Sequence, residues 1–311
     1  MSITPSLGLH HVTAISGAPV ENSRFYTETM GLRRVKKTVN FDDPGAFHLY
    51  YGDRLGQPGT ALTFFAFANV RGARSGAGEA RELAWHVPDN TLDDWAERLK
   101  TAGVAVTRST RFERPRLTAR DPHGFIFALV EGGVAAREPW AGSPLDAGHQ
   151  LGGFAGIDIV SRQPAATARV LQTVLGYAPV GEDGGWQRFQ ACGAASGQSC
   201  IDVAGAPALP VAAGGQGSVH HIAFRARDLA HQAEMAEAAR GLGLNPTEVI
   251  DRQYFESVYF REPGGVLFEI ATDEPGFTVD EDAAELGQAL RLPPRYEPRR
   301  AAIEAALPPL D

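Results

Sequence analysis

The sequence predicts an α+β protein built from four βαβββ units that pair into two cupped sheets. Similar turns, DPHG at 121–124 and EPGG at 262–265, are each followed by an apolar strand, at 125–130 and 266–271. Two other strands also begin alike, with LHHV at 9–12 and VHHI at 219–222. The repeat of roughly 55 to 75 residues indicates one supersecondary unit per repeat, and such a unit must pair to bury its sheet.

The first two units occupy the N-terminal half. Unit one has a strand at 9–15, a helix at 19–30 and strands at 34–40, 46–51 and 61–67. Pro19 suits the first turn of this helix and Gly31 its C-terminal cap. Pro and Gly at 43–45 and 56–59 mark turns between the strands. Unit two has a strand at 82–87, a helix at 91–101 with apolar residues at helical spacing, and strands within 104–130.

The C-terminal half repeats this pattern. Unit three has a strand at 156–160, a helix at 164–175 and strands up to 203; unit four has a strand at 219–224, a helix at 229–242 and strands at 257–261 and 266–271. Segments rich in Gly and Ala separate the units, and the one at 71–80 is expected to be a mobile connector. We predict an N-terminal half at 1–135, a C-terminal half at 151–275 and a C-terminal arm at 276–311.

Composition restricts the partners. The 311 residues carry a net charge of −8, which disfavours nucleic acid and anionic membranes as main partners. No apolar run is long enough to span a bilayer, and the sequence starts without a signal-peptide pattern, so a cytoplasmic location is expected. Cys192 and Cys200 are too few for a disulfide framework and are expected to be free thiols.

Glu269 lies in the middle of the apolar strand at 266–271. Side chains alternate along a strand, so Glu269 shares a face with Leu267 and Ala271. A buried carboxylate without a partner is costly, and the partner is expected to be an Arg, a Lys or a metal ion. The histidines of the repeated strand openings favour the metal ion.

Strand alternation predicts how these histidines are directed. His11 shares a face with Thr13, while His10 and His220 fall on the apolar face that suits packing beneath a helix. His11 and His221 then point into the cup, where they join Glu269 to form the two-histidine, one-carboxylate triad typical of non-haem Fe(II). This favours pairing of unit one with four and of unit two with three, although a site across the interface of a homo-oligomer uses the same ligands.

Units two and three lack this set of ligands. Ala128 takes the position of Glu269, and Glu82 and Gly156 take the position of His11. One metal ion per chain is therefore expected. Five further histidines fall at unrelated positions of the repeat and are expected to be structural: His48, His86, His123, His149 and His231.

Five segments carry a family resemblance: HHVT at 10–13, VNFDDP at 39–44, HLYYGD at 48–53, VHHIAF at 219–224 and YFREPGG at 259–265. They resemble the hydroquinone ring-cleaving dioxygenases of the chlorohydroquinone dioxygenase and MhqO-like group. This group lies within the vicinal oxygen chelate superfamily, with the glyoxalases, bleomycin-resistance proteins and type I extradiol dioxygenases. The resemblance covers nearly the whole chain in order, and it is more specific for the family than for the substrate.

The resemblance implies a ligand set and a reaction. The metal ligands would be His11, His221 and Glu269, and the pocket residues would be His10, Thr13, His220, Arg252 and Tyr259. The implied activity is opening of a small aromatic ring of hydroquinone or catechol type, with Fe(II) as cofactor and O2 as co-substrate; Mn(II) accepts the same ligands. Tyr259 is a candidate proton donor or acceptor and Arg252 a candidate to stabilise negative charge. His10 or His220 would assist deprotonation of the substrate hydroxyl.

Two other functions are compatible with the same fold. A glyoxalase-like isomerase or lyase would use a divalent metal only as a Lewis acid, but this class usually supplies a second carboxylate, which neither Ala128 nor the strand at 63–66 offers. A bleomycin-resistance type of protein would bind an aromatic compound without catalysis, and generally needs no metal triad. The intact triad therefore favours ring cleavage.

Overall fold

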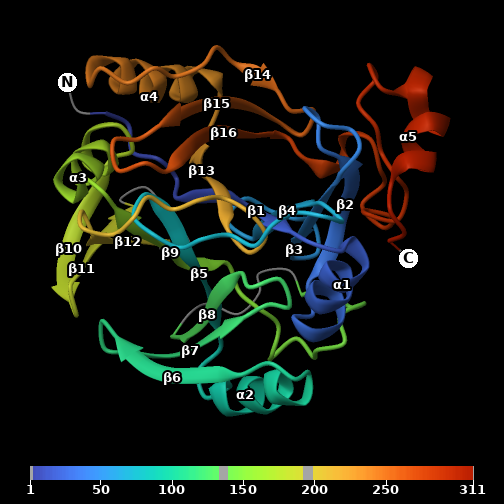
Figure 1. The fold of residues 1–311 in the computed structure, drawn as a ribbon, viewed down its shortest axis with the longest axis horizontal. Coiled ribbons are helices and arrows are strands. Elements are labelled where there is room, and N and C mark those ends of the chain that lie inside the picture. The colour runs from blue at the N-terminus through green and yellow to red at the C-terminus, as the bar shows by residue number, and fades with distance from the viewer. Residues whose placement is uncertain (1–2, 133–138, 192–198, 311) are drawn as a thin grey trace.

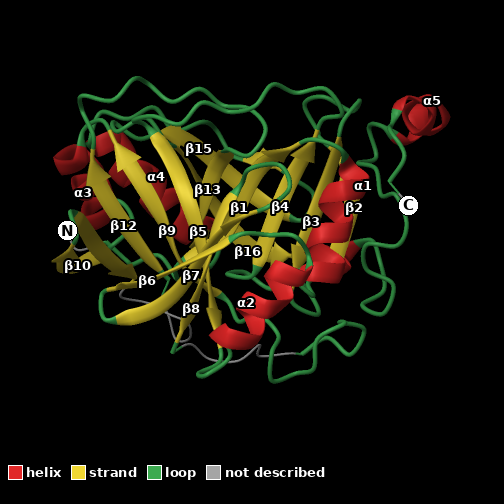
Figure 2. Cartoon of the chain, turned by 60° about the horizontal axis from the view of Figure 1, so that its bottom comes forward, coloured by secondary structure: helices red, strands yellow, loops and turns green. Residues whose placement is uncertain are grey.

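The structure, a computed structural model, describes residues 3–132, 139–191 and 199–310. Its strands form two curved eight-stranded sheets (Figure 1) with the helices on their outer sides (Figure 2). Each sheet combines two βαβββ units. The predicted α+β fold with two cupped sheets is therefore confirmed.

The first sheet joins unit one to unit four in the order β14-β15-β16-β13-β1-β4-β3-β2. Unit one contributes β1 Leu9–Ser16, β2 Arg33–Val39, β3 Phe47–Gly52 and β4 Ala61–Ala66. Unit four contributes β13 Val219–Ala226, β14 Ile250–Asp251, β15 Phe255–Arg261 and β16 Leu267–Pro275. The strands β1 and β13 pair antiparallel at the centre of the sheet, and β4 and β16 flank them in parallel.

The second sheet joins unit two to unit three in the order β10-β11-β12-β9-β5-β8-β7-β6. Its strands are β5 Glu79–Val87, β6 Val106–Arg111, β7 Arg114–Arg120, β8 Ile126–Glu131, β9 Phe154–Ser161, β10 Tyr177–Asp183, β11 Trp186–Ala191 and β12 Cys200–Gly205. The favoured pairing of the units is confirmed, within one chain. The halves 1–135 and 151–275 stay a prediction, and each sheet takes one unit from each half.

The helices of the four units cover one face of each sheet, whereas α5 belongs to the C-terminal arm. They are α1 Pro19–Arg24, which continues as the π-helical turn η1 Phe25–Thr29, α2 Leu92–Thr101, α3 Pro164–Thr173, α4 Leu229–Gly241 and α5 Arg300–Ala306, with 3-10 turns η2 Phe277–Val279 and η3 Glu297–Arg299. The main hydrophobic core contains side chains of α2, α3 and α4 together with Val12 and Ala14 of β1. Because strand side chains alternate, His11 and Thr13 face away from this core.

The connector at 71–80 is not the mobile segment that we expected. It pairs with the Gly/Ala-rich segment at 204–217, between units three and four. The backbone bridges are Gly72–Gln216, Arg74–Ala213 and Ala77–Val211. These bridges satisfy backbone groups that a free loop would leave to water. In the described part of the chain, no helix is both long and apolar enough to cross a membrane.

The expectation of free thiols can be checked for one of the two cysteines. Cys200 carries a thiol, as expected, and burial raises its pKa to about 11. Cys192 lies outside the described residues.

Candidate metal centre

Three side chains of adjacent strands meet at the centre of the first sheet: His11 of β1, His221 of β13 and Glu269 of β16. All three are buried. The Nε2 atoms of His11 and His221 lie 3.3 Å apart. Glu269 Oε2 lies 3.3 Å from His11 Nε2 and 2.9 Å from His221 Nε2. The structure thus brings together the nitrogen, nitrogen and oxygen atoms of the expected ligand set.

The hydrogen bonding and the pKa of Glu269 are those expected of a ligand to a cation. Its Oε1 atom accepts a hydrogen bond from Ser257 Oγ at 2.5 Å, whereas its buried Oε2 atom makes no hydrogen bond to the described residues. A buried oxygen left in this way is costly, and a metal ion between Oε2 and the two imidazoles would compensate it. Burial alone would raise the pKa of Glu269, but His11 and His221 hold it well below its usual range, so the carboxylate is ionised as a ligand must be.

His10 and His220 do not lie on the packed face that strict alternation predicts. The pairing of β1 with β13 shifts register between Leu9 and His11, which leaves His10 as an extra residue, and a second shift leaves His220 as an extra residue of β13. Such β-bulges redirect a side chain. His10 Nδ1 lies 3.0 Å from His11 Nδ1, and His220 Nδ1 lies 2.8 Å from His221 Nδ1. Our expectation of a packed face was therefore wrong for both residues.

These two contacts orient the candidate ligands. A histidine that binds a metal through Nε2 carries its proton on Nδ1 and donates it to a neighbouring acceptor. Burial, and then the charge of His11, lowers the pKa of His10 to about 3. Burial, and then His221, lowers the pKa of His220 to about 4. Both are therefore neutral near pH 7, and their Nδ1 atoms can accept from the histidines that follow them.

Thr63 stands where a fourth ligand would be expected. In β16, Glu269 pairs with Ala223, two residues after His221. In β4, Thr63 pairs with Thr13, two residues after His11. The hydroxyl oxygens of Thr63 and Thr13 lie 2.8 Å apart, and Thr13 is buried beneath the pocket and does not form its wall. The position in unit one that matches Glu269 thus carries a hydroxyl and not a second carboxylate.

The second sheet carries charged side chains at the comparable place. Ala128 pairs with Ala84, so the position of Glu269 is apolar there, as predicted. Glu82 contacts Arg116 and lies 3.4 Å from Arg111, and so is part of a network of ion pairs. Among the described residues, the triad of the first sheet is the one group of three ligating side chains that could hold a metal ion.

A pocket of about 510 Å3 opens above the triad. Its apolar and aromatic walls are Ile15, Phe41, Phe65, Phe67, Phe255 and Leu267, and its polar groups are His11, Asn40, Asp42, His48, Tyr50, His220, His221, Thr247, Arg252 and Tyr259. A pocket with apolar walls and a few directed polar groups is typical of small-molecule sites. His10 does not line it.

His48 was missed as a pocket residue. We expected a structural role, but its ring forms part of the pocket wall, with Nε2 2.8 Å from Thr63 Oγ1 and Nδ1 2.9 Å from Tyr50 Oη. Burial, and then the charges of His11 and other site residues, lowers its pKa well below the usual range, so His48 is neutral. The available signal was the HLYYGD segment at 48–53, which belongs to the family resemblance.

Arg252 and Tyr259 lie side by side at the pocket. Arg252 Nε donates to Tyr259 Oη at 3.2 Å, and Arg252 Nη1 lies 3.4 Å from Asp42 Oδ2. Burial and the charge of Glu269 raise the pKa of Tyr259, so its phenol keeps its proton near pH 7. Burial alone would lower the pKa of Arg252, but Tyr259 and Asp42 raise it. The pocket thus presents one fixed cation and one phenol proton.

Comparison with known proteins agrees with this architecture. The chain matches the Glyoxalase/Bleomycin resistance protein/Dioxygenase superfamily over residues 8–129 and 153–270. It is 40% identical to MhqO of Bacillus subtilis (strain 168), named a ring-cleaving dioxygenase, over 98% of this chain and 97% of that protein. It is 34% identical to a chlorohydroquinone/hydroquinone 1,2-dioxygenase of Sphingobium indicum, over 93% and 92% of the two chains.

Solved structures extend the comparison. A crystal structure of a protein described as a dioxygenase from Bacillus subtilis has a TM-score of 0.95 and 39% identity, covering 99% of this chain and 98% of that one. Glyoxalase I of Zea mays has a TM-score of 0.64 at 15% identity, covering 86% and 92%, which supports the fold alone. The chain belongs to the glyoxalase, bleomycin resistance protein and dioxygenase superfamily and has the vicinal oxygen chelate fold.

Proposed function

We propose that this protein is an Fe(II)-dependent dioxygenase that opens a hydroquinone-type aromatic ring with O2. The observation that carries the proposal is the triad of His11, His221 and Glu269 at a pocket with aromatic walls, with no second carboxylate beside the triad among the described residues. Relatives that align over nearly their full length are named ring-cleaving dioxygenases, and one is named for chlorohydroquinone and hydroquinone.

The triad would hold the metal on one side. When bound there, Fe(II) supplies open positions for a phenolate oxygen and O2 and lowers the pKa of the bound hydroxyl. Mn(II) accepts the same ligands and is an alternative. His10 and His220 would keep the two ligand imidazoles in the required tautomer, and Ser257 would hold Glu269.

The remaining pocket residues would act on the substrate directly. Phe65 and Phe255 present aromatic surface to a ring, which favours offset or edge-to-face packing. Arg252 would stabilise negative charge that develops on the ring oxygens. Tyr259 holds its proton on Oη and could donate it to a substrate oxygen. The apolar walls exclude water and so strengthen both interactions.

Two other functions fit this geometry less well. A glyoxalase-like isomerase would be expected to use a carboxylate at the position of Thr63. Simple binding of an aromatic compound would not require the convergence of His11, His221 and Glu269. A cytoplasmic location and a homo-oligomeric state stay predictions from the sequence.

The test is oxygen consumption. Protein purified without oxygen is reconstituted with Fe(II) or with Mn(II) and mixed with hydroquinones and catechols in an oxygen electrode. We expect one O2 to be consumed per ring opened, and no uptake by Glu269→Ala. Tight binding of nickel or zinc, with isomerase activity and no oxygen uptake, would replace the proposal with the glyoxalase-like alternative.

A further inference from the structure

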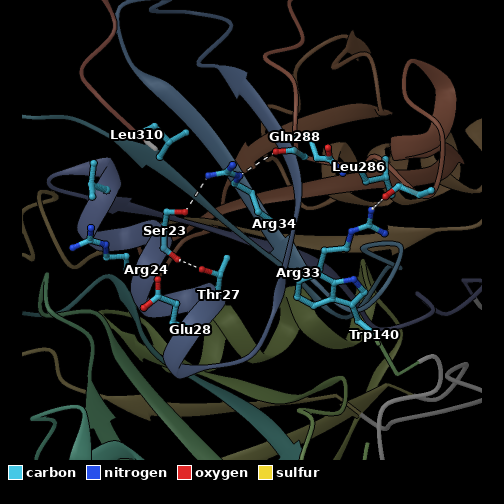
Figure 3. A pocket seen from close by; sticks show the side chains of 13 residues that line it. Ser23, Arg24, Thr27, Glu28, Arg33, Arg34, Trp140, Leu286, Gln288 and Leu310 are labelled. Carbon is cyan, nitrogen blue, oxygen red and sulfur yellow. Dashed lines mark hydrogen bonds between the residues drawn. The ribbon is translucent and has the colours of Figure 1, made fainter. Parts of the chain in front are cut away.

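The C-terminal arm is anchored along β2, at one edge of the sheet that carries the candidate site (Figure 1). Arg33 donates to the carbonyl oxygens of Ala283 and Ala284 at 2.8 and 2.9 Å. Arg34 Nε donates to the carbonyl oxygen of Gly287 at 3.1 Å; Arg33 and Arg34 are shown in Figure 3. A Cβ atom on Gly287 would overlap with the carbonyl of Arg34. The backbone of the arm therefore rests directly on β2.

Asp280 of the arm contacts both edges of this sheet. Its Oδ1 atom accepts from Lys36 Nζ of β2 at 2.5 Å. Its Oδ2 atom accepts from Gln253 Nε2 at 2.7 Å and from Tyr254 Oη at 3.1 Å. Gln253 and Tyr254 follow β14, which is the opposite edge strand. One carboxylate thus bridges the two edges of the sheet, which six strands separate.

The Lys36 end of the bridge is buried, whereas Asp280 is 22% exposed. Lys36 is 0% exposed, and its ammonium group also donates to Glu281 Oε2 at 2.5 Å and to the carbonyl oxygen of Phe277 at 2.9 Å. It lies 4.8 Å from the centre of the Tyr254 ring. Phe277 packs against Tyr254 at a ring distance of 5.3 Å and against the pocket residue Tyr50 at 5.2 Å. Interactions in such a setting are screened little by water.

The contact between Asp280 and Gln253 affects the position of Arg252. Gln253 has a φ of 68°, a left-handed conformation that costs a non-glycine residue of order 1 kcal/mol or more and persists only when surrounding contacts hold it. Asp280 supplies one such contact through the side chain, and Asp251 Oδ1 another through the backbone N–H at 2.6 Å. Arg252 precedes this residue, so the turn determines how its guanidinium enters the pocket.

We propose that Asp280 is a positioning residue of the pocket, which closes the half-barrel from edge to edge and holds Arg252 beside Tyr259 through the turn at Gln253. It does not touch the substrate. It acts through the backbone direction at Arg252. The kinetic part of this inference rests on the proposed dioxygenase function, whereas the structural part does not.

The test uses two variants and a control in the full-length, Fe(II)-loaded protein. Asp280→Ala removes the whole bridge, and Gln253→Ala removes the link to the turn while the pairing of Lys36 with Asp280 remains. Asp282→Ala, an exposed aspartate of the same arm, is the control. Each is measured for bound iron, for kcat and KM of oxygen uptake with hydroquinone, and by crystallography, and each is combined with Arg252→Ala.

We expect full iron binding in all variants and wild-type kinetics for Asp282→Ala. Asp280→Ala and Gln253→Ala should lose about 10 to 100 fold in kcat/KM, as for a catalytic group displaced by about 1 Å. In the Arg252→Ala background they should cause little further loss, because residues that act as a unit are not additive. Losses that multiply in that background, or wild-type kinetics for Gln253→Ala, would overturn the proposal.

The crystal structures separate failure of this inference from failure of the proposed function. If the wild type consumes no oxygen with any ring substrate, the dioxygenase proposal fails, but the separation of Arg252 Nε from Tyr259 Oη in Gln253→Ala still decides the positioning role. We expect that separation to exceed hydrogen-bonding distance. An unchanged 3.2 Å contact would contradict the role of the bridge, and Gln253→Ala decides the question even if Asp280→Ala does not fold.

Discussion

Thr63 occupies in β4 the register position that Glu269 occupies in β16. Each pairs with the residue two places after a candidate histidine ligand, Thr63 with Thr13 and Glu269 with Ala223. At the matched position, unit one therefore carries a hydroxyl where unit four carries a carboxylate. An open metal position is what separates catalytic sites from closed ones.

Thr63→Glu is expected to close the site. The new carboxylate would reach the triad as a fourth ligand, so the metal should be retained more strongly against a chelator while oxygen uptake falls by roughly tenfold or more, the scale of changes around a metal's ligands. Thr63→Val, which keeps the shape but loses the hydrogen bonds to Thr13 and His48, is the control and should lose less. Wild-type oxygen uptake by Thr63→Glu would show that the substrate and O2 do not need this side of the triad.

Ser257→Ala is expected to weaken metal binding. The Ser257 hydroxyl is the hydrogen-bond donor to Glu269 Oε1, and removal of such a supporting contact typically costs about 10 to 100 fold in metal affinity. Titration with Mn(II) alone, followed by calorimetry, measures this without any turnover. Ser6→Ala, which removes another buried hydroxyl with carbonyl partners, should leave the affinity unchanged. Equal affinities of Ser257→Ala and wild type would contradict the role.

Part of this site could be predicted from sequence because it follows the period of a strand. His11, His221 and Glu269 belong to repeated segments, and alternation directs regular strand residues correctly. His10 and His220 were misplaced because a β-bulge adds one residue to a strand without a compositional signal. Only the pairing of β1 with β13 reveals it.

The remaining errors concern long-range contacts. His48 reaches the pocket because β3 pairs with β4, next to β1, an arrangement that local patterns do not specify. The contacts of the C-terminal arm were not predicted either. Its buried contacts are made by Lys36, a β2 residue 244 positions from Asp280, and charged residues are rarely expected to be fully buried.

Neutral buried histidines predict acid sensitivity of the metal-free protein. Burial is the main reason that the pKa of His10 falls to about 3 and that of His48 well below its usual value of 6.5. Below about pH 6.5 the unfolded chain binds more protons at these residues than the folded chain does. The free energy of unfolding should therefore fall as pH decreases from about 6.5 towards 4, by about 1.4 kcal/mol per pH unit for each histidine.

Urea unfolding across this pH range, with chelator present, measures the effect. Asp158, whose pKa burial raises to about 6, acts in the opposite direction, because its folded form binds the extra proton. Asp158 is present in both wild type and His48→Gln, so the comparison of these two proteins removes the contribution of Asp158. The free energy of unfolding of His48→Gln should change less steeply with pH than that of wild type, by the contribution of one histidine. Parallel curves would show that His48 titrates normally in the folded protein.

The turn between β15 and β16 supports the strand that carries Glu269. Glu262 is buried in this turn. Its Oε1 atom accepts from the Val266 N–H at 2.9 Å, and its Oε2 atom accepts from the Gly264 N–H and from Thr167 Oγ1, both at 2.7 Å. Thr167 lies in α3 of unit three, so this one carboxylate also links the two sheets.

Glu262→Ala should lower the free energy of unfolding by about 2 to 4 kcal/mol, because it leaves two backbone N–H groups and one hydroxyl without their acceptor. Glu262→Gln keeps one acceptor oxygen and should lose less. Glu248→Ala, at an exposed glutamate ahead of β14, is the control for loss of a negative charge and should be close to wild type. Urea unfolding of the four proteins gives the comparison. If Glu262→Ala were as stable as the control, the hairpin would be held by strand pairing alone, and the link to α3 would contribute nothing to the position of Glu269.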